Sequence, residues 1–277
     1  MTKRELLKDL LEQAKKVELP IEEMKNLFIG MGNPESKILI VGKEASIDGY
    51  NAQSILEIVK NISQWERDIN KHWSEVAYRE WSEEKFSPLY PYRGQIKKRD
   101  SRIRNPKAKY NFGTSPTWLN YQKVRDTILG TFSDVINFHE NCFITELNQI
   151  PSRYSNKQEK VTREKMIAIR QKTIFASEYI RSFPVVILAC GDDYVKMLDI
   201  KINSLFGVEK YGQRREISWG NKGRKQGYDI YRNIHGSPPK IVVHTWQLSQ
   251  YIKDEYIQMI GKDIADFCNE NNIKLQL

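Results

Sequence analysis

Four short, continuous apolar runs constrain the fold of this 277-residue chain more than any other feature. None of them alternates between apolar and polar residues, which is typical of strands that are buried on both faces. Helical periodicity fills the intervals, most clearly over 161–181, 192–205 and 248–269. The four runs occupy residues 37–41, 142–145, 185–189 and 240–244. This repetition predicts a three-layer αβα fold, an α/β architecture around a central, mostly parallel four-stranded sheet.

The N-terminus predicts a helical cap on this core. Thr2 and Glu5 have the spacing of a capping box, and leucines follow them at helical intervals. A second short helix is expected to begin at Pro20 and to run through Phe28.

Two long stretches, about 47–117 and 207–239, do not fit a minimal four-stranded sheet. We interpret them as insertions in a single domain that spans 1–277. Both cluster cations among aromatic residues, a pattern that suits phosphate contacts and base stacking. A solvated, loop-rich surface is the alternative interpretation. The expected DNA-binding cations are Lys97, Lys98, Arg99, Arg102 and Arg104 in the first stretch, and Arg214 and Arg215 in the second.

The composition favours a nucleic-acid partner and excludes several other classes. Lys and Arg number 44 against 35 Asp and Glu, a surplus of +9 that favours a polyanion. No apolar run approaches the roughly 20 residues that span a bilayer, and no signal-peptide core is visible, so we expect a cytoplasmic protein with no membrane partner. The three cysteines lack metal-site spacing. We therefore expect no cofactor, no metal and a monomer.

The strand ends hold the residues that could carry chemistry, because ligands bind beyond the carboxyl ends of parallel strands. The first strand runs into Gly42-Lys43-Glu44-Ala45-Ser46, where a glycine allows close approach and a carboxylate can accept a proton or orient water. The last strand ends at His244, and Ser249 follows at an expected helix start, where free amides can bind phosphate. A structural histidine and a simple N-cap are the alternatives.

These segments resemble the paired motifs of the uracil-DNA glycosylase superfamily. The family's Gly-Gln-Asp-Pro-Tyr corresponds to residues 42–46, and its His-Pro-Ser-Pro-Leu-Ser-x-Tyr corresponds to His244-Thr245-Trp246-Gln247-Leu248-Ser249-Gln250-Tyr251. Residues 143–148 are similar to the Tyr-Ile-Thr-Asn strand of the iron–sulfur branch, and residues 186–191 to its Val-Ile-Val-Ala-Leu-Gly strand. The resemblance covers about 37–46, 142–151, 184–194 and 240–251, and neither insertion.

The resemblance implies a monofunctional DNA glycosylase that flips a base out of DNA and hydrolyses its N-glycosidic bond, leaving an abasic site. Glu44 matches the family's carboxylate, which stabilises the sugar cation and positions water. His244 matches the family's histidine, which stabilises the departing base. Leu248 matches the leucine that fills the gap in the duplex. The remaining DNA contacts are expected from Ser46, Thr245, Trp246 and Ser249, although Trp246 could instead pack under its loop.

Departures from the family pattern affect the expected substrate. Ala45 and Ser46 replace a proline and a pocket-closing aromatic residue, which should open the site. Glu146 stands where the family has its base-reading Asn, with Asn148 two residues on. A carboxylate only accepts hydrogen bonds and suits an exocyclic amino group such as cytosine N4. We therefore expect a cytosine-derived or bulky modified base, in repair or in defence against phage DNA. The expected base-binding residues are Gly42, Lys43, Glu146 and Asn148.

Two other functions remain open at this stage. The chain could be a catalytically inactive relative that still binds nucleic acid, or an enzyme on free nucleosides that shares only the sheet. Asp192 and Asp193 precede Lys196, but the strand arrangement of a metal-dependent nuclease is missing, so we interpret these acids as a helix cap.

Overall fold

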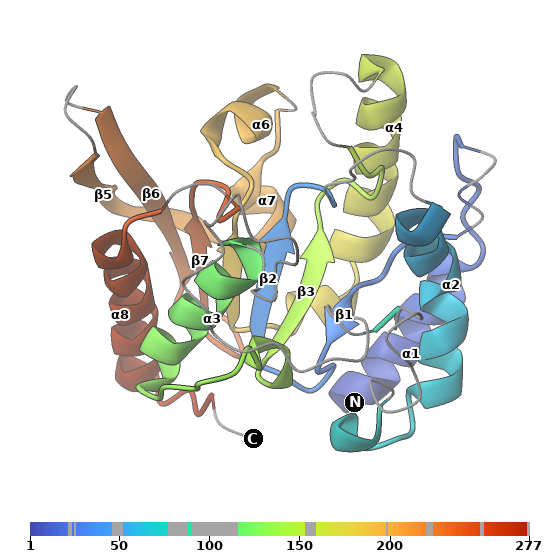
Figure 1. Ribbon diagram of the computed structural model, residues 1–277, viewed down its shortest axis with the longest axis horizontal. Helices are drawn as coiled ribbons and strands as arrows, with labels where there is room; N and C mark the ends of the chain where they lie inside the picture. The colour runs from blue at the N-terminus through green and yellow to red at the C-terminus, as the bar shows by residue number, and fades with distance from the viewer. Residues whose placement is uncertain are drawn as a thin grey trace, which may run out of the picture.

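A computed structural model describes residues 1–21, 24, 26–45, 52–76, 88–89, 116–152, 159–197, 199–219, 224–249 and 252–275. They build a seven-stranded mixed sheet in the order β1-β3-β2-β4-β7-β6-β5 (Figure 1). Its parallel centre consists of the four predicted strands, which are β3 (Cys142–Glu146), β2 (Ile38–Gly42), β4 (Val185–Leu188) and β7 (Lys240–His244). Every residue of β2, β4 and β7 is buried, which explains why these strands are continuous apolar runs.

Antiparallel strands extend the sheet at both edges beyond the four that were expected. The short β1 (Met31–Gly32) pairs with β3 at one edge. At the other edge β6 (Arg224–Asn233) pairs with β7, and β5 (Glu209–Trp219) pairs with β6. The second insertion, for which a loop-rich surface was the alternative interpretation, is therefore mostly strand. Residues 226–230 of β6 are all buried, whereas the described side chains of the edge strand β5 are exposed or half-buried, because only β6 packs against the core sheet.

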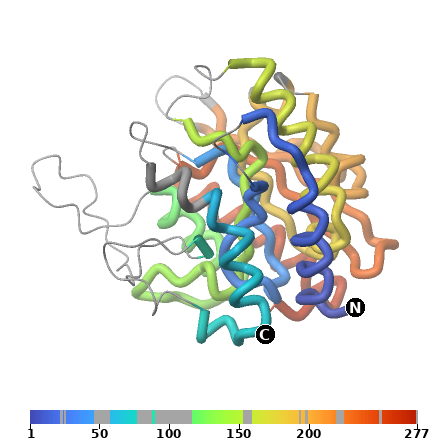
Figure 2. Tube along the Cα trace, turned by 90° about the vertical axis from the view of Figure 1, so that its right-hand side faces the viewer, coloured from blue at the N-terminus to red at the C-terminus, as the bar shows by residue number. Residues whose placement is uncertain are grey.

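Helices cover both faces of the sheet, as the predicted three-layer architecture requires. One face is covered by α3 (Pro116–Leu129) and α8 (Asp254–Glu270) (Figure 1). Figure 2 shows α1 and α4 on the opposite side from α3. The second layer consists of α1 (Lys3–Ala14), α4 (Lys160–Arg170) with a π-turn at Gln171–Phe175, α5 (Glu178–Arg181) and α7 (Ile202–Phe206). The other described α-helices are α2 (Ala52–Asp68), near the β1 edge (Figure 1), and the short α6 (Asp192–Met197), and single 3-10 turns lie at Trp73–Glu75 and Phe138–Glu140.

The N-terminal cap was only half predicted. The capping box of α1 is present, because Thr2 Oγ1 accepts from the Glu5 amide and Glu5 accepts from the Thr2 amide. The second helix is wrong for the described residues of 20–28, which form bends and irregular chain. Backbone amides of this segment form hydrogen bonds with side chains of other elements, and not within a helix. The Phe28 amide donates to the Gln149 side chain, and the Ile29 amide donates to the Asn61 side chain. None of the described helices is long and apolar enough to span a membrane.

A buried arginine ties the carboxyl end of β3 to the segment that precedes β1. Arg170 is 0% exposed and donates to the carbonyls of Glu146 (3.0 Å) and Phe28 (2.5 Å). It also donates to Gln149 Oε1 at 3.1 Å and to Thr145 Oγ1 at 2.9 Å. Burial lowers its pKa to about 9, against the opposing pull of the Glu146 carboxyl. The hydrogen bonds compensate for placing a cation in the core.

Replacing this side chain should be among the costlier single changes in the protein. Arg170→Met removes four hydrogen bonds in the interior, and we expect it to lower the free energy of unfolding by ~3 kcal/mol or more. Arg181→Met, at an exposed position at the end of α5, is the matched control and should cost about 0.5 kcal/mol or less. Urea denaturation measures both. Equal effects of the two substitutions would contradict the structural role of Arg170.

Candidate functional site

The sheet has a topological switch point at β2. The next strand along the chain, β3, lies on one side of β2, and β4 lies on the other. Chain segments therefore leave the carboxyl ends of β2 and β4 in opposite directions, which opens a crevice between them. A cavity of about 320 Å³ lies there, at the place where the strand ends were expected to carry chemistry. Its lining residues are Lys43, Cys190, Gly191, Asp192, Tyr194, Trp246 and Gln247.

Glu44 is a buried carboxylate next to this cavity. Its side chain is 4% exposed, and the Lys43 ammonium is 3.9 Å from Glu44 Oε1. The same ammonium lies 4.6 Å from the centre of the Tyr194 ring. Burial, and then the charge of and hydrogen bonding to Glu44, hold the pKa of the Tyr194 hydroxyl far above its ordinary value, while hydrogen bonding to Asn148 opposes them. An acid, a cation and two neutral polar groups thus converge at the end of β2.

A second carboxyl group, that of Glu146, lies against the backbone of Gly42. A β-carbon at position 42 would overlap Glu146 Oε2, so the close approach requires glycine. That oxygen is buried and has no hydrogen-bond partner among the described residues. Burial first, and then the nearby charge of Glu44, raise the pKa of Glu146 to about 8, although Arg170 opposes the rise.

This shift favours the protonated form of Glu146 at neutral pH. A protonated carboxyl offers one donor and one acceptor, as a side-chain amide does. This differs from the expectation that position 146 only accepts hydrogen bonds, and the reason is burial beside a second acid. The neighbouring Asn148 is also buried, and its Oδ1 accepts from the Ile150 amide at 3.1 Å. Both candidate base-reading residues therefore lie on the β3 side of the crevice.

His244 contacts a different part of the site from Glu44. It is 5% exposed, with Nε2 3.4 Å from the Gly191 carbonyl and Nδ1 3.9 Å from Asp192 Oδ1. Burial lowers the pKa of His244, while the charge of Asp192 opposes this shift. Helix α6 contributes a residue to each part of the site, because Asp192 faces His244 and Tyr194 lies beside Glu44. Since β4 separates β2 from β7, the two strands lie about 10 Å apart, which leaves room for a ligand between the predicted catalytic residues.

His244 lines a second, larger cavity of about 820 Å³, which shares Asp192 with the first. The wall formed by the β5–β6 ribbon, residues 209–219 and 224–233, includes Lys210, Arg214, Asp229 and Tyr231. The wall from α6 and α7 includes Val195, Lys196, Ile202 and Asn203. The two cavities together offer more space than a single unmodified base would fill.

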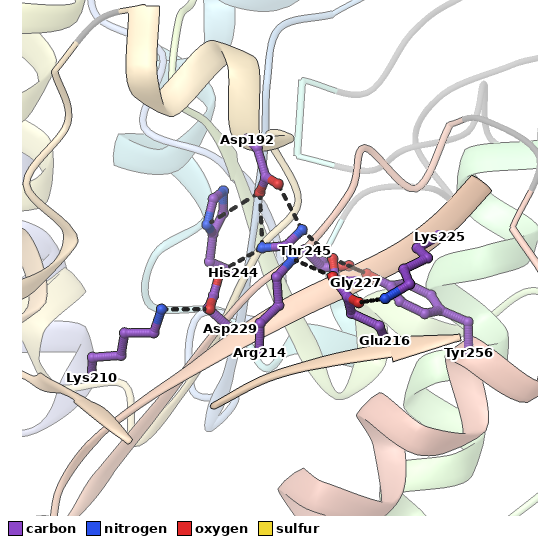
Figure 3. A network of polar contacts seen from close by, with 10 residues as sticks. All are labelled: Asp192, Lys210, Arg214, Glu216, Lys225, Gly227, Asp229, His244, Thr245 and Tyr256. Carbon is purple, nitrogen blue, oxygen red and sulfur yellow. Dashed lines mark hydrogen bonds and ion pairs between the residues drawn. The ribbon is translucent and has the colours of Figure 1, made fainter. Parts of the chain in front are cut away.

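Arg214 organises the polar wall of the larger cavity (Figure 3). Its guanidinium bonds to Asp192 Oδ2 at 2.6 Å, to Asp229 Oδ2 at 2.5 Å and to the Gly227 carbonyl at 2.8 Å. The Lys210 ammonium lies 2.9 Å from Asp229 Oδ1. The terminal nitrogens of Arg214 already donate to two carboxylates and a carbonyl, and the contact of Arg214 with DNA stays a prediction.

Sequence reasoning missed the two acids of this network. Asp192 had been interpreted as a helix cap, and Asp229 had not been singled out. Arg214 and its basic neighbours were the visible signal, but nothing local in the sequence pairs an arginine with an acid 22 residues away. Arg215, also predicted to bind DNA, is 48% exposed and pairs with Asp263 at 3.1 Å.

One group of side chains in the described part of the chain has the composition of a metal site. Atoms of Asp192, Asp229 and His244 lie within 4.8 Å of one another. Arg214 and Lys210 already neutralise both carboxylates, so the donor set faces cations of the protein itself.

Two residues predicted to touch DNA are buried instead. Thr245 is 0% exposed and bonds to the Tyr256 hydroxyl at 2.7 Å. Leu248 is 1% exposed and belongs to the hydrophobic core, so in this conformation it does not reach a duplex. Trp246 and Ser249 are partly exposed, and Trp246 lines the smaller cavity. The predicted DNA contacts that lie outside the described residues are Ser46, Lys97, Lys98, Arg99, Arg102 and Arg104.

Comparison with known proteins identifies no relative, since no protein-family model, no curated protein and no solved structure matches the chain.

The raised pKa of Glu146 predicts a specific dependence of stability on pH. The folded protein holds this proton more tightly than the unfolded chain, so the contribution to stability is full below the ordinary pKa of 4.5 and is lost as the pH rises through about 8. Glu146→Gln removes the titration and keeps the shape. Over this window the variant should lose less stability than the wild type in urea denaturation. Glu164→Gln, on α4, is the control, and wild-type behaviour of Glu146→Gln would contradict the assignment.

Proposed function

We propose that the protein is a monofunctional DNA glycosylase, a divergent relative of the uracil-DNA glycosylase superfamily. It would flip a base out of DNA and hydrolyse the N-glycosidic bond, leaving an abasic site. The observation that carries this proposal is the buried Glu44 carboxylate at the switch point, beside a protonated Glu146 and the Lys43 ammonium. A pair of neighbouring carboxyl groups is the arrangement that glycoside hydrolysis uses.

Each charge in this arrangement has a place in the reaction. Breaking the bond builds positive charge on the sugar and negative charge on the departing base. Glu44 would stabilise the sugar cation and orient the attacking water, and its burial strengthens that interaction. Lys43 lines the smaller cavity and His244 the larger one, and both would balance the charge that develops on the departing base. The proton on Glu146 would donate a hydrogen bond to the base or its leaving atom.

The larger cavity supports a modified base as the substrate. It adjoins the smaller cavity through Asp192, so a substituent on a base in the first would extend into the second. The cavity wall includes amide, ammonium and carboxylate groups, which would hydrogen-bond a bulky polar substituent. Such bases occur as damage and as protective modifications of phage DNA, and we propose repair or antiviral defence as the setting. Position 146, being protonated, does not by itself restrict the base to cytosine derivatives.

Removing the central carboxylate tests the proposal. Duplex DNAs carrying uracil, damaged bases or phage-type modifications are incubated with the full-length protein, and alkali-labile sites are counted. Glu44→Gln keeps the shape of the side chain but loses its charge, and we expect the rate to fall by about 10²- to 10⁴-fold. Glu164→Gln makes the same chemical change at a partly exposed position on α4 and should leave the rate unchanged.

DNA binding measured at several salt concentrations separates this proposal from its alternative. A glycosylase forms abasic sites that Glu44→Gln abolishes, with salt-sensitive binding retained. An inactive binding relative shows the same steep salt dependence and no abasic sites on any DNA of the panel. Equal activity of Glu44→Gln and the wild type would contradict the role assigned to the carboxylate.

A further inference from the structure

We propose that the β5–β6 ribbon positions His244 through Arg214 and Asp192, and that these two are positioning residues. The inference rests on the proposed function for the role of His244, but its geometry is independent of it. Four groups form one continuous chain of contacts from the ribbon to the imidazole, namely Asp229, Arg214, Asp192 and His244 (Figure 3).

The ribbon is shaped to direct Arg214 inward. The register of β5 against β6 shifts between Tyr211 and Arg215, and Gly212 within that shift has a φ of +69°. Bulges of this kind re-aim a side chain, often beside an active site. On the opposite strand a β-carbon at Gly227 would lie 2.6 Å from Arg214 Nε. Glycine at this place therefore lets the guanidinium cross β6 toward α6.

Arg214 then fixes Asp192. Its two terminal nitrogens reach both carboxylate oxygens, at 2.6 and 3.3 Å, and this forked contact sets the plane of the carboxylate. Asp229 accepts from the same guanidinium at 2.5 Å, and Lys210 holds Asp229 in turn. A single lysine could not bridge the two acids in this way.

Asp192 in turn faces His244. The ring lies between Asp192 Oδ1, 3.9 Å from Nδ1, and the Gly191 carbonyl, 3.4 Å from Nε2. The second contact is at the long limit of a hydrogen bond, so Nε2 can exchange that carbonyl for an atom of a ligand in the larger cavity. The charged groups that face His244 are Asp192 from α6, Asp229 from β6 and Arg214 from β5. A carboxylate beside Nδ1 favours the positive charge that a histidine gains as it stabilises a departing anion.

NMR titration of His244 in the full-length protein tests the positions of these charges directly. Asp192→Asn removes a negative charge beside the ring and should lower the pKa of His244 by about 1. Arg214→Met removes a positive charge and should raise it. Lys225→Met, which breaks only the exposed pair with Glu216 in the same ribbon, should leave it unchanged. Thermal denaturation of each variant verifies folding. The proposal is overturned if the pKa of His244 in Asp192→Asn and in Arg214→Met is the same as in Lys225→Met.

Kinetics separate positioning from charge. Arg214→Lys keeps the positive charge but loses the two-pronged contact with the Asp192 carboxylate. The pKa of His244 should therefore stay near that of the wild type. Its kcat for base release should nevertheless fall at least about 10-fold with little change in KM. Unchanged kcat in Arg214→Lys would overturn the positioning role. If no DNA of the panel loses a base, the proposed function fails, while the titration still decides whether the ribbon sets the environment of His244.

Discussion

Charged groups at the carboxyl edge of the parallel sheet lie largely out of reach of water, and each must be balanced from within the protein. Two arginines provide most of this balance. Arg170 holds the end of β3 through four hydrogen bonds, and Arg214 joins the two acids beside β7. Without such partners a buried charge would cost on the order of several kcal/mol. That cost is a large share of the free energy of unfolding of a typical domain.

Between the two arginines, the carboxyl end of β2 holds a smaller set of ionisable groups. On the β3 side burial, and then the charge of Glu44, raise the pKa of Glu146 to about 8, while Arg170 bonds to neutral acceptors. On the β7 side burial lowers the pKa of His244, while Asp192 beside the ring opposes this shift and favours a positive charge there. Glu44 and Lys43 lie between these sides at the end of β2. The proposed chemistry uses this arrangement, because a reaction that separates charge needs an acid, a proton donor and a cation close together.

The parallel centre could be predicted from the sequence because its strands are buried on both faces and so appear as continuous apolar runs. The same geometry placed Glu44 and His244 at one edge of the sheet. The β5–β6 ribbon was missed because its charged, partly exposed residues resemble those of a solvated loop. The link from Arg214 to Asp192 and the proton on Glu146 depend on pairings and burial that only the folded chain creates. Leu248 was misplaced because a motif match does not reveal which face of a loop meets the core.

Mass spectrometry of the small molecules released from a DNA panel tests the central claim most directly. The wild-type protein should release a free base, with one alkali-labile site for each base released and no strand break before alkali treatment. Modified bases should be released more readily than uracil, because the site adjoins a second cavity. Release of nucleotides in place of bases, or no release from any DNA to which the protein binds, would contradict the account.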